Sequence, residues 1–262
     1  MFPFINLGFI QLPMYGLMIL LGLIVAFFIA KYLIKVKSLQ ILDFIIIAAL
    51  TICFGFVGAK VLYLFVSVPL KDIIDTLIDL LFVPENSQIQ SGFVFYGGLL
   101  GGILGFFVGV KIADVHITDY LDIFAIIVPL VHGFGRIGCL FAGCCYGKPY
   151  QGFLSITVTS VFSSAPHNIS LFPVQLLEAI CLLSIAFFLF LIVLKKKFEN
   201  CVFFIYLIMY SFVRFFIEFL RFDYYRGFVG VLSVSQFISI VLFCFSIGLL
   251  FLKNKLKTLT FF

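Results

Sequence analysis

The sequence predicts an all-α polytopic membrane protein with about seven transmembrane helices and a small extracytoplasmic cap. Two observations support this. Hydrophobic residues fill 64% of the 262 positions and charged residues only 11%, with a mean hydropathy of +1.27, far above soluble domains. Apolar runs of about 20 residues, long enough to cross a bilayer, also recur along the chain. Since no long polar or proline-rich segment divides the chain, residues 1–262 are expected to form a single membrane-embedded domain.

The apolar runs are the candidate spans. They cover residues 14–34, 42–66, 93–110, 119–140, 173–194, 201–220 and 231–252. The third run is rich in glycine, and small residues let helix backbones approach closely in lipid. We therefore expect this run to form a central, buried helix.

The Lys and Arg residues between the runs predict the orientation. If the N-terminus is outside, the inner loops and tail carry nine of them: Lys35, Lys37, Lys111, Lys195, Lys196, Lys197, Lys253, Lys255 and Lys257. The outer segments then carry three, Lys71, Lys148 and Arg226. This bias predicts the N-terminus outside and the C-terminus inside. The net charge of +5 therefore concerns membrane orientation, and no nucleic-acid partner is expected.

Two long loops fall on the predicted outer side. The first covers residues 67–92 and carries four acidic residues. The second covers residues 141–172 and forms the expected extracytoplasmic cap. Its β-branched residues within 154–162 predict short strands lying on the membrane face.

Charged residues within or at the ends of the apolar runs are the main functional signal. They are Lys60, Asp122, Arg136, Glu178, Arg214, Glu218 and Arg221. A charge at membrane depth costs a few kcal/mol on insertion scales, so a functional or paired role is the default. The spacing of Arg214, Glu218 and Arg221 predicts one shared helical face. Either these charges neutralise one another, or a surplus arginine binds an anion such as a phospholipid phosphate, which suits the guanidinium fork.

The segment 132–147 combines Arg136 with glycines and three thiols, Cys139, Cys144 and Cys145, at the predicted outer end of the fourth run. The four other cysteines lie in apolar runs, where a thiol packs as a small hydrophobic group. The spacing of the three thiols matches no common zinc or redox motif, so neither a metal nor a cofactor is expected.

Several separated segments form an ordered pattern. They are Tyr15-Gly16-Leu17-Met18; Gly55 to Lys60 with Tyr63; Phe95 to Gly101; Asp122 with Gly135-Arg136-Ile137-Gly138 and Tyr146-Gly147; Pro173-Val174-Gln175 with Glu178; and Arg214 to Arg221. In this order they resemble the phosphatidylglycerol–prolipoprotein diacylglyceryl transferase family.

The resemblance implies a multi-pass enzyme of the bacterial cytoplasmic membrane whose active site faces outward. Such an enzyme moves diacylglycerol from phosphatidylglycerol to the lipobox cysteine in the signal peptide of a prolipoprotein, and glycerol phosphate leaves. It works among membrane lipids without a cofactor. By position, Arg136 and Arg214 hold the phosphate, Tyr15, Tyr210 and Gly147 line or shape the lipid pocket, and Glu218 orients an arginine. Further candidates for substrate binding are Gly97, Gly98, Asp122, Gly138, Cys139 and Arg221.

Three positions depart from the family pattern. Tyr96 replaces a histidine before Gly-Gly, Cys139 replaces an asparagine, and Ala142-Gly143-Cys144 replaces Asn-Gly-Glu. Tyrosine is a poorer base than histidine at neutral pH. Tyr96 and His132 are therefore both catalytic candidates, while His132 can equally be a core histidine bonded to the backbone.

Three alternatives to the transferase remain open from the sequence. A paralogue could modify another acceptor. A thiol redox or metal-binding protein could use Cys139, Cys144 and Cys145. A transporter would account for the intramembrane charges but nothing more.

Overall fold

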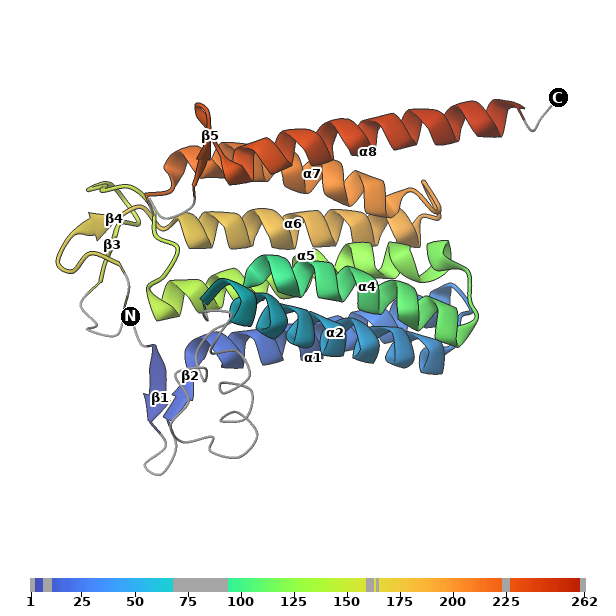
Figure 1. Cartoon of the computed structure of the whole chain (residues 1–262), viewed down its shortest axis with the longest axis horizontal. Coiled ribbons are helices and arrows are strands. Elements are labelled where there is room, and N and C mark those ends of the chain that lie inside the picture. Colours follow the sequence, from blue (N-terminus) through green and yellow to red (C-terminus); the bar gives the residue numbers. More distant parts are fainter. Residues whose placement is uncertain are drawn as a thin grey trace. The chain divides into compact units, whose positions relative to one another are not determined.

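The computed structural model describes residues 3–6, 11–67, 94–158, 163, 165–222 and 227–259. Within them, seven helices are long and apolar enough to cross a membrane, which confirms the predicted fold class. They are α1 (Met14–Val36), α2 (Ile41–Ser67), α4 (Phe95–Ala113), α5 (Ile117–Ala142), α6 (Val174–Leu194), α7 (Val202–Ile217) and α8 (Val234–Leu259) (Figure 1). A short 3₁₀ helix, η4 (Glu218–Leu220), extends α7.

The helix ends lie within three residues of the predicted ones, except that α8 continues to Leu259, seven residues beyond its predicted end. Pro13 and Pro173 stand directly before α1 and α6, where a residue without an N–H leaves no helical hydrogen bond unmade. Pro129 lies inside α5. A proline is tolerated within a membrane helix because groups of neighbouring helices can bond the backbone oxygen that it leaves unpaired. Apart from Ser67, the first long loop, residues 67–92, lies outside the described residues. Lys71 and Arg226 also lie outside them. The direction of the chain across the membrane stays a prediction.

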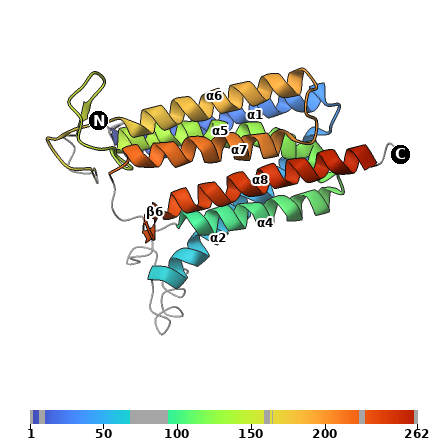
Figure 2. The ribbon, with the colours of Figure 1, turned by 90° about the horizontal axis from the view of Figure 1, so that it is seen from above.

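The chain divides into two compact units, of which the first comprises Met1–Lys37 and Leu121–Phe262. In this unit α6, α7 and α8 run along one another, as both views show (Figures 1 and 2). In the described part of this unit, three two-stranded hairpins lie at one end of these helices: β1–β2 (Phe4–Asn6, Gln11–Pro13), β3–β4 (Ile156–Thr157, Ser170–Leu171) and β5–β6 (Phe228–Val229, Leu232–Ser233). The last turn of α8 lies at the opposite end (Figure 1).

The second unit, Ser38–Tyr120, pairs α2 with α4. Gly97 and Gly101 lie directly against α2, and a Cβ on either one would overlap the backbone oxygen of Gly58 or Phe54. The glycine pattern thus serves helix packing, as expected. The expectation that the whole helix is buried was wrong. The part of the α4 surface that carries Leu100 and Leu104 is exposed, at 67% and 55%.

The region predicted as a cap, residues 141–172, begins in the last turn of α5, and its described part contains the β3–β4 hairpin. Ile156 pairs with Leu171, and Pro149 forms a further bridge to Leu171. Val158, Ala165 and Leu171 make a small buried cluster against Tyr146. The described part of this region therefore has apolar contacts of its own at the hairpin end of the first unit.

Candidate functional site

Four charged side chains from three segments meet at the hairpin end of the first unit. The Glu178 carboxylate, 1% exposed on α6, has its Oε1 atom 3.1 Å from Arg136 Nη2 on α5 and 3.7 Å from Arg214 Nη1 on α7. Glu218 Oε2 lies 2.9 Å from Arg214 Nη2, one helical turn along. We call these residues, Arg136, Glu178, Arg214 and Glu218, the arginine cluster. One carboxylate oxygen thus lies between two guanidinium groups.

The hydrogen-bonding capacity of the arginine cluster is only partly used. The contact of Arg214 Nη1 with Glu178 is too long for a hydrogen bond, and that of Arg136 lacks the geometry of one. Among the described residues, neither Glu178 Oε1 nor Arg214 Nη1 has a hydrogen-bond partner. Arg214 Nη2 does donate to Ser235 Oγ at 3.2 Å. Buried polar groups are normally paired, so spare donors at this depth favour a ligand site.

His132 lies one turn before Arg136 on α5. Its Nε2 atom accepts a hydrogen bond from Arg136 Nε at 3.3 Å, which requires the neutral imidazole. Its ring meets Tyr210 edge to face, with centroids 5.6 Å apart, and Tyr210 stacks on Tyr206. These contacts fix the Arg136 side chain between a histidine and a carboxylate. They favour a positioning role for His132, because the lone pair that a base would use is already engaged.

The expected helical face of Arg214, Glu218 and Arg221 is only partly formed. Arg214 and Glu218 make the i,i+4 ion pair. The α-helix ends at Ile217, however, and Arg221 follows η4 with extended backbone. Its backbone forms an isolated β-bridge with Gly147. The shared face was therefore a wrong prediction for Arg221, because the chain leaves the helix to pair with the segment after α5.

Two of the predicted glycines hold other site residues in place. A Cβ on Gly138 would come within 3.1 Å of the Tyr15 Cα, so α1 and α5 approach closely here. A Cβ on Gly147 would lie 2.5 Å from the Phe172 oxygen and 3.1 Å from the Leu220 oxygen. Tyr15 and Arg221 are thereby brought to the same end of the unit as the arginine cluster.

Asp122 does not join this site. It lies 14 positions before Arg136 on α5, about 21 Å away along the helix axis. Its carboxylate, 1% exposed, pairs with Lys37 Nζ at 3.1 Å and accepts the Asn200 N–H at 2.9 Å. The structure therefore gives Asp122 a pairing role at the opposite end of the first unit, and its predicted substrate contact is not supported.

Tyr96, Gly97 and Gly98 belong to α4 in the second unit. Gly97 lies against Gly58 and Leu62, and Gly98 lies against Ala59 and the Gly55 oxygen. Tyr96 is exposed at the start of the helix. Both glycines thus have a packing explanation within their own unit.

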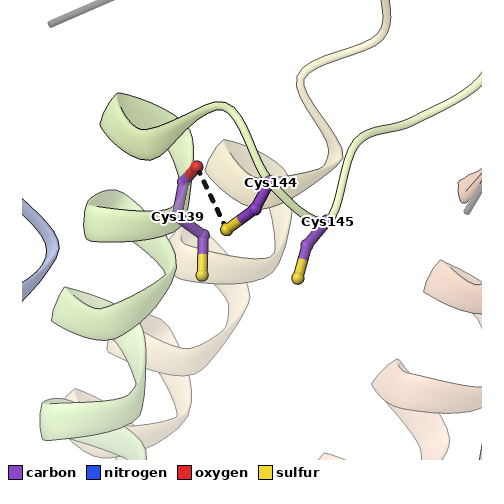
Figure 3. A group of neighbouring side chains, drawn as sticks. All are labelled: Cys139, Cys144 and Cys145. Carbon is purple, nitrogen blue, oxygen red and sulfur yellow. Dashed lines mark hydrogen bonds between the residues drawn. The ribbon is translucent and has the colours of Figure 1, made fainter. Parts of the chain in front are cut away.

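Three thiols gather where α5 ends (Figure 3). The Sγ atoms of Cys139, Cys144 and Cys145 all lie within 4.8 Å of one another. The neighbouring Cys139 and Cys144 thiols, together with the charges of Arg221 and Arg136, lower the pKa of the Cys145 thiol well below its usual value. The sequence singled out these three thiols as a group without a known ligand spacing, and the turn after α5 brings their sulfur atoms together.

Two residues of the site were missed or undervalued in the sequence. Glu178 was noted as an intramembrane charge but not as a site residue, although its position in an apolar run was the available signal. Ser235 carries no such signal, since nothing in the sequence places it beside Arg214. Both contact an arginine from a different segment.

Comparison with known proteins identifies the family of the chain. A family model described as prolipoprotein diacylglyceryl transferase matches residues 3–252. The phosphatidylglycerol–prolipoprotein diacylglyceryl transferase of Clostridium tetani is 37% identical over 236 residues, 90% of each chain. A transferase of the same name, numbered 2, from Clostridium perfringens is 38% identical over 208 residues, 79% of this chain and 77% of the relative. That of Prochlorococcus marinus strain MIT 9301 is 30% identical over 285 residues, 96% of this chain and 92% of the relative.

Proposed function

This chain belongs to the prolipoprotein diacylglyceryl transferase family, and we propose that it uses Arg136 and Arg214 to move a diacylglyceryl group from phosphatidylglycerol to a prolipoprotein. The chain is a membrane-embedded transferase. The acceptor is the lipobox cysteine of the signal peptide. The site opens to the outer side of the bacterial cytoplasmic membrane, at the end that carries the hairpins.

The observation that carries this assignment is the shared contact of two arginines on Glu178. Because Arg136 Nη2 and Arg214 Nη1 lie 3.1 Å and 3.7 Å from the same oxygen, both groups are close enough to contact one phosphate. Arg214 Nη1 still has hydrogen-bonding capacity. In a site poor in water, such contacts are stronger than at an aqueous surface.

In the reaction, the acceptor thiolate attacks the glycerol carbon that carries the phosphate. A carbon–sulfur bond forms and a carbon–oxygen bond breaks, so glycerol phosphate leaves with the bonding electrons and the thiol proton is released. The two guanidinium groups stabilise the charge that develops on the departing phosphate. Glu178, Glu218 and His132 hold the guanidinium groups in position, while Tyr15 and Tyr210 flank the lipid.

The function is tested with the purified chain in lipid nanodiscs containing phosphatidylglycerol and a labelled lipobox peptide. We expect the peptide to gain one diacylglyceryl thioether and glycerol phosphate to appear in equal amount. A peptide with serine in place of the cysteine is the control and should gain nothing. If the folded chain modifies no peptide and releases no glycerol phosphate, the proposal is wrong. As the main function of the chain, the paralogue with another acceptor, the thiol redox or metal-binding protein and the transporter receive no support from the family match.

A further inference from the structure

We propose that Cys139, Cys144 and Cys145 form a binding site for one thiophilic metal ion, of the class of Zn²⁺ or Cu⁺. This site lies beside the arginine cluster, but the transferase chemistry does not use it. Among the described residues, these three form the one group of three or more His, Cys, Asp or Glu side chains close enough to hold an ion together. An all-thiolate ligand set selects soft metals over Mg²⁺ or Ca²⁺.

The distances fit such an ion. Metal–sulfur bonds of about 2.3 Å, in tetrahedral or trigonal geometry, place bound sulfurs roughly 3.8 to 4.0 Å apart. The three Sγ atoms all lie within 4.8 Å of one another, on one side of the turn (Figure 3). Closing onto an ion therefore requires a contraction of at most about 1 Å, which rotation of the side chains can supply.

Ordinary helix termination explains only two of the three thiols. The Cys144 N–H bonds the Cys139 oxygen at 3.1 Å and the Gly143 N–H bonds the Leu140 oxygen at 3.3 Å, with Gly143 at φ 68°. This is a Schellman ending, which brings the side chains of Cys139 and Cys144 together. It does not account for Cys145, which is also left-handed at φ 55°. That conformation is uncommon for a residue with a side chain, and here it brings the third sulfur to the other two.

The turn that carries the thiols is held from both sides. Gln175 Nε2 on α6 donates to the Cys144 oxygen at 2.7 Å. The Phe222 N–H bonds the Tyr146 oxygen at 3.2 Å, and the Lys148 N–H bonds the Leu220 oxygen at 3.0 Å. Ligands fixed in this way lose little freedom when a metal binds, which favours affinity.

Neighbouring arginines can compensate the charge of the metal-bound thiolates. Each thiol loses its proton to solvent as its metal–sulfur bond forms, so three thiolates with Zn²⁺ carry one net negative charge and with Cu⁺ two. The positive charges of Arg221 and Arg136 act on Cys145 and compensate this excess. The step needs neither an oxidant nor a reductant. Metal binding can therefore be measured whether or not the transferase proposal holds.

The test is a titration of the reduced full chain in detergent with Zn²⁺ and, separately, with Cu⁺, against a chromophoric chelator. We expect one ion per chain, with affinity at least roughly tenfold lower in Cys144→Ser and in Cys145→Ser. Cys181→Ser is the matched control, since Cys181 is a half-buried free cysteine on α6, and it should bind as the unaltered chain does. The metal that binds more tightly identifies the preferred ion.

A second measurement uses the unaltered chain and so does not depend on whether the variants fold. Alkylation followed by mass spectrometry should show Cys139, Cys144 and Cys145 protected by the metal, while Cys181 reacts equally with and without it. The proposal is overturned if no ion binds, if binding is the same in both serine variants, or if the metal leaves the three thiols as reactive as before.

Discussion

The two ends of α5 each bury charged side chains, but in opposite ways. At one end, Asp122 pairs with Lys37 and accepts the Asn200 N–H, while Lys253 Nζ binds the Asn200 oxygen at 2.6 Å. At the other end, Arg136 and Arg214 share one oxygen of Glu178 through contacts that lack hydrogen-bond geometry. At the first end, the charged groups are paired by hydrogen bonds within the protein. At the second end, Arg214 Nη1 has no hydrogen-bond partner among the described residues and can donate to a ligand.

This difference shows that burial of charge alone does not mark a site. A charged pair whose hydrogen bonds are made within the protein has little to offer a ligand, whereas two like charges held on one carboxylate are ready to accept an anion. The family resemblance placed Asp122 and Arg136 together as substrate contacts. The structure separates them along the helix, and we expect mutations at the two ends to have different effects.

The largest effect is expected for Arg136→Gln. The variant keeps a polar side chain but removes one of the two charges that stabilise the leaving phosphate, so the rate of transfer should fall by roughly 10²- to 10³-fold. The initial rate of peptide modification in nanodiscs measures this loss. Lys37→Gln removes a charge at the other end of the unit and is the control. A rate for folded Arg136→Gln within about fivefold of the unaltered chain would contradict the assignment.

Glu178→Gln should have the next largest effect. The amide keeps the shape but not the charge, so the two guanidinium groups repel each other and move apart. We expect a loss of activity of up to about 100-fold, because small displacements of positioning groups are costly. The unfolding free energy should also fall, by about 3 kcal/mol, since the buried Arg214 and the largely buried Arg136 lose their shared partner. Transfer rates and chemical denaturation measure the two effects, and unchanged values for both would show that Glu178 does not hold the arginines.

The sequence was sufficient to predict the spans, because apolar length is set by the thickness of the bilayer. It also identified Arg136 and Arg214, since charge in an apolar run is rare. It could not show that Glu178 lies between them, because that contact joins three helices far apart in sequence. The spacing of Arg214, Glu218 and Arg221 assumed a continuous α-helix, yet the α-helix ends at Ile217 and the backbone is extended at Arg221. The thiol cluster likewise depends on the turn at Gly143, which no ligand motif in the sequence records.

Asp122→Asn should separate stability from activity. The amide can still accept the Asn200 N–H but leaves the charge of Lys37 without its partner, so the unfolding free energy should fall by about 2 kcal/mol. The transfer rate, measured below the unfolding transition, should stay within about twofold of the unaltered chain because Asp122 lies far from the arginines. A tenfold or greater loss of rate in the folded variant would mean that the two ends of α5 are coupled, and the contrast drawn between them would fail.

The smallest effect is expected for Ser235→Ala. Its hydroxyl accepts a hydrogen bond from Arg214 Nη2 at 3.2 Å, so the variant loses one bond to a charged group while Glu218 still holds the same nitrogen. A loss of about 1 kcal/mol corresponds to a roughly fivefold fall in kcat/KM. Ser239→Ala is the matched control, because Ser239 lies one turn further along α8 and donates to the Ser235 backbone oxygen at 2.8 Å. Equal rates for the two variants would mean that Ser235 does not position Arg214, so that the site would consist of the four charged residues and α8 would contribute nothing to it.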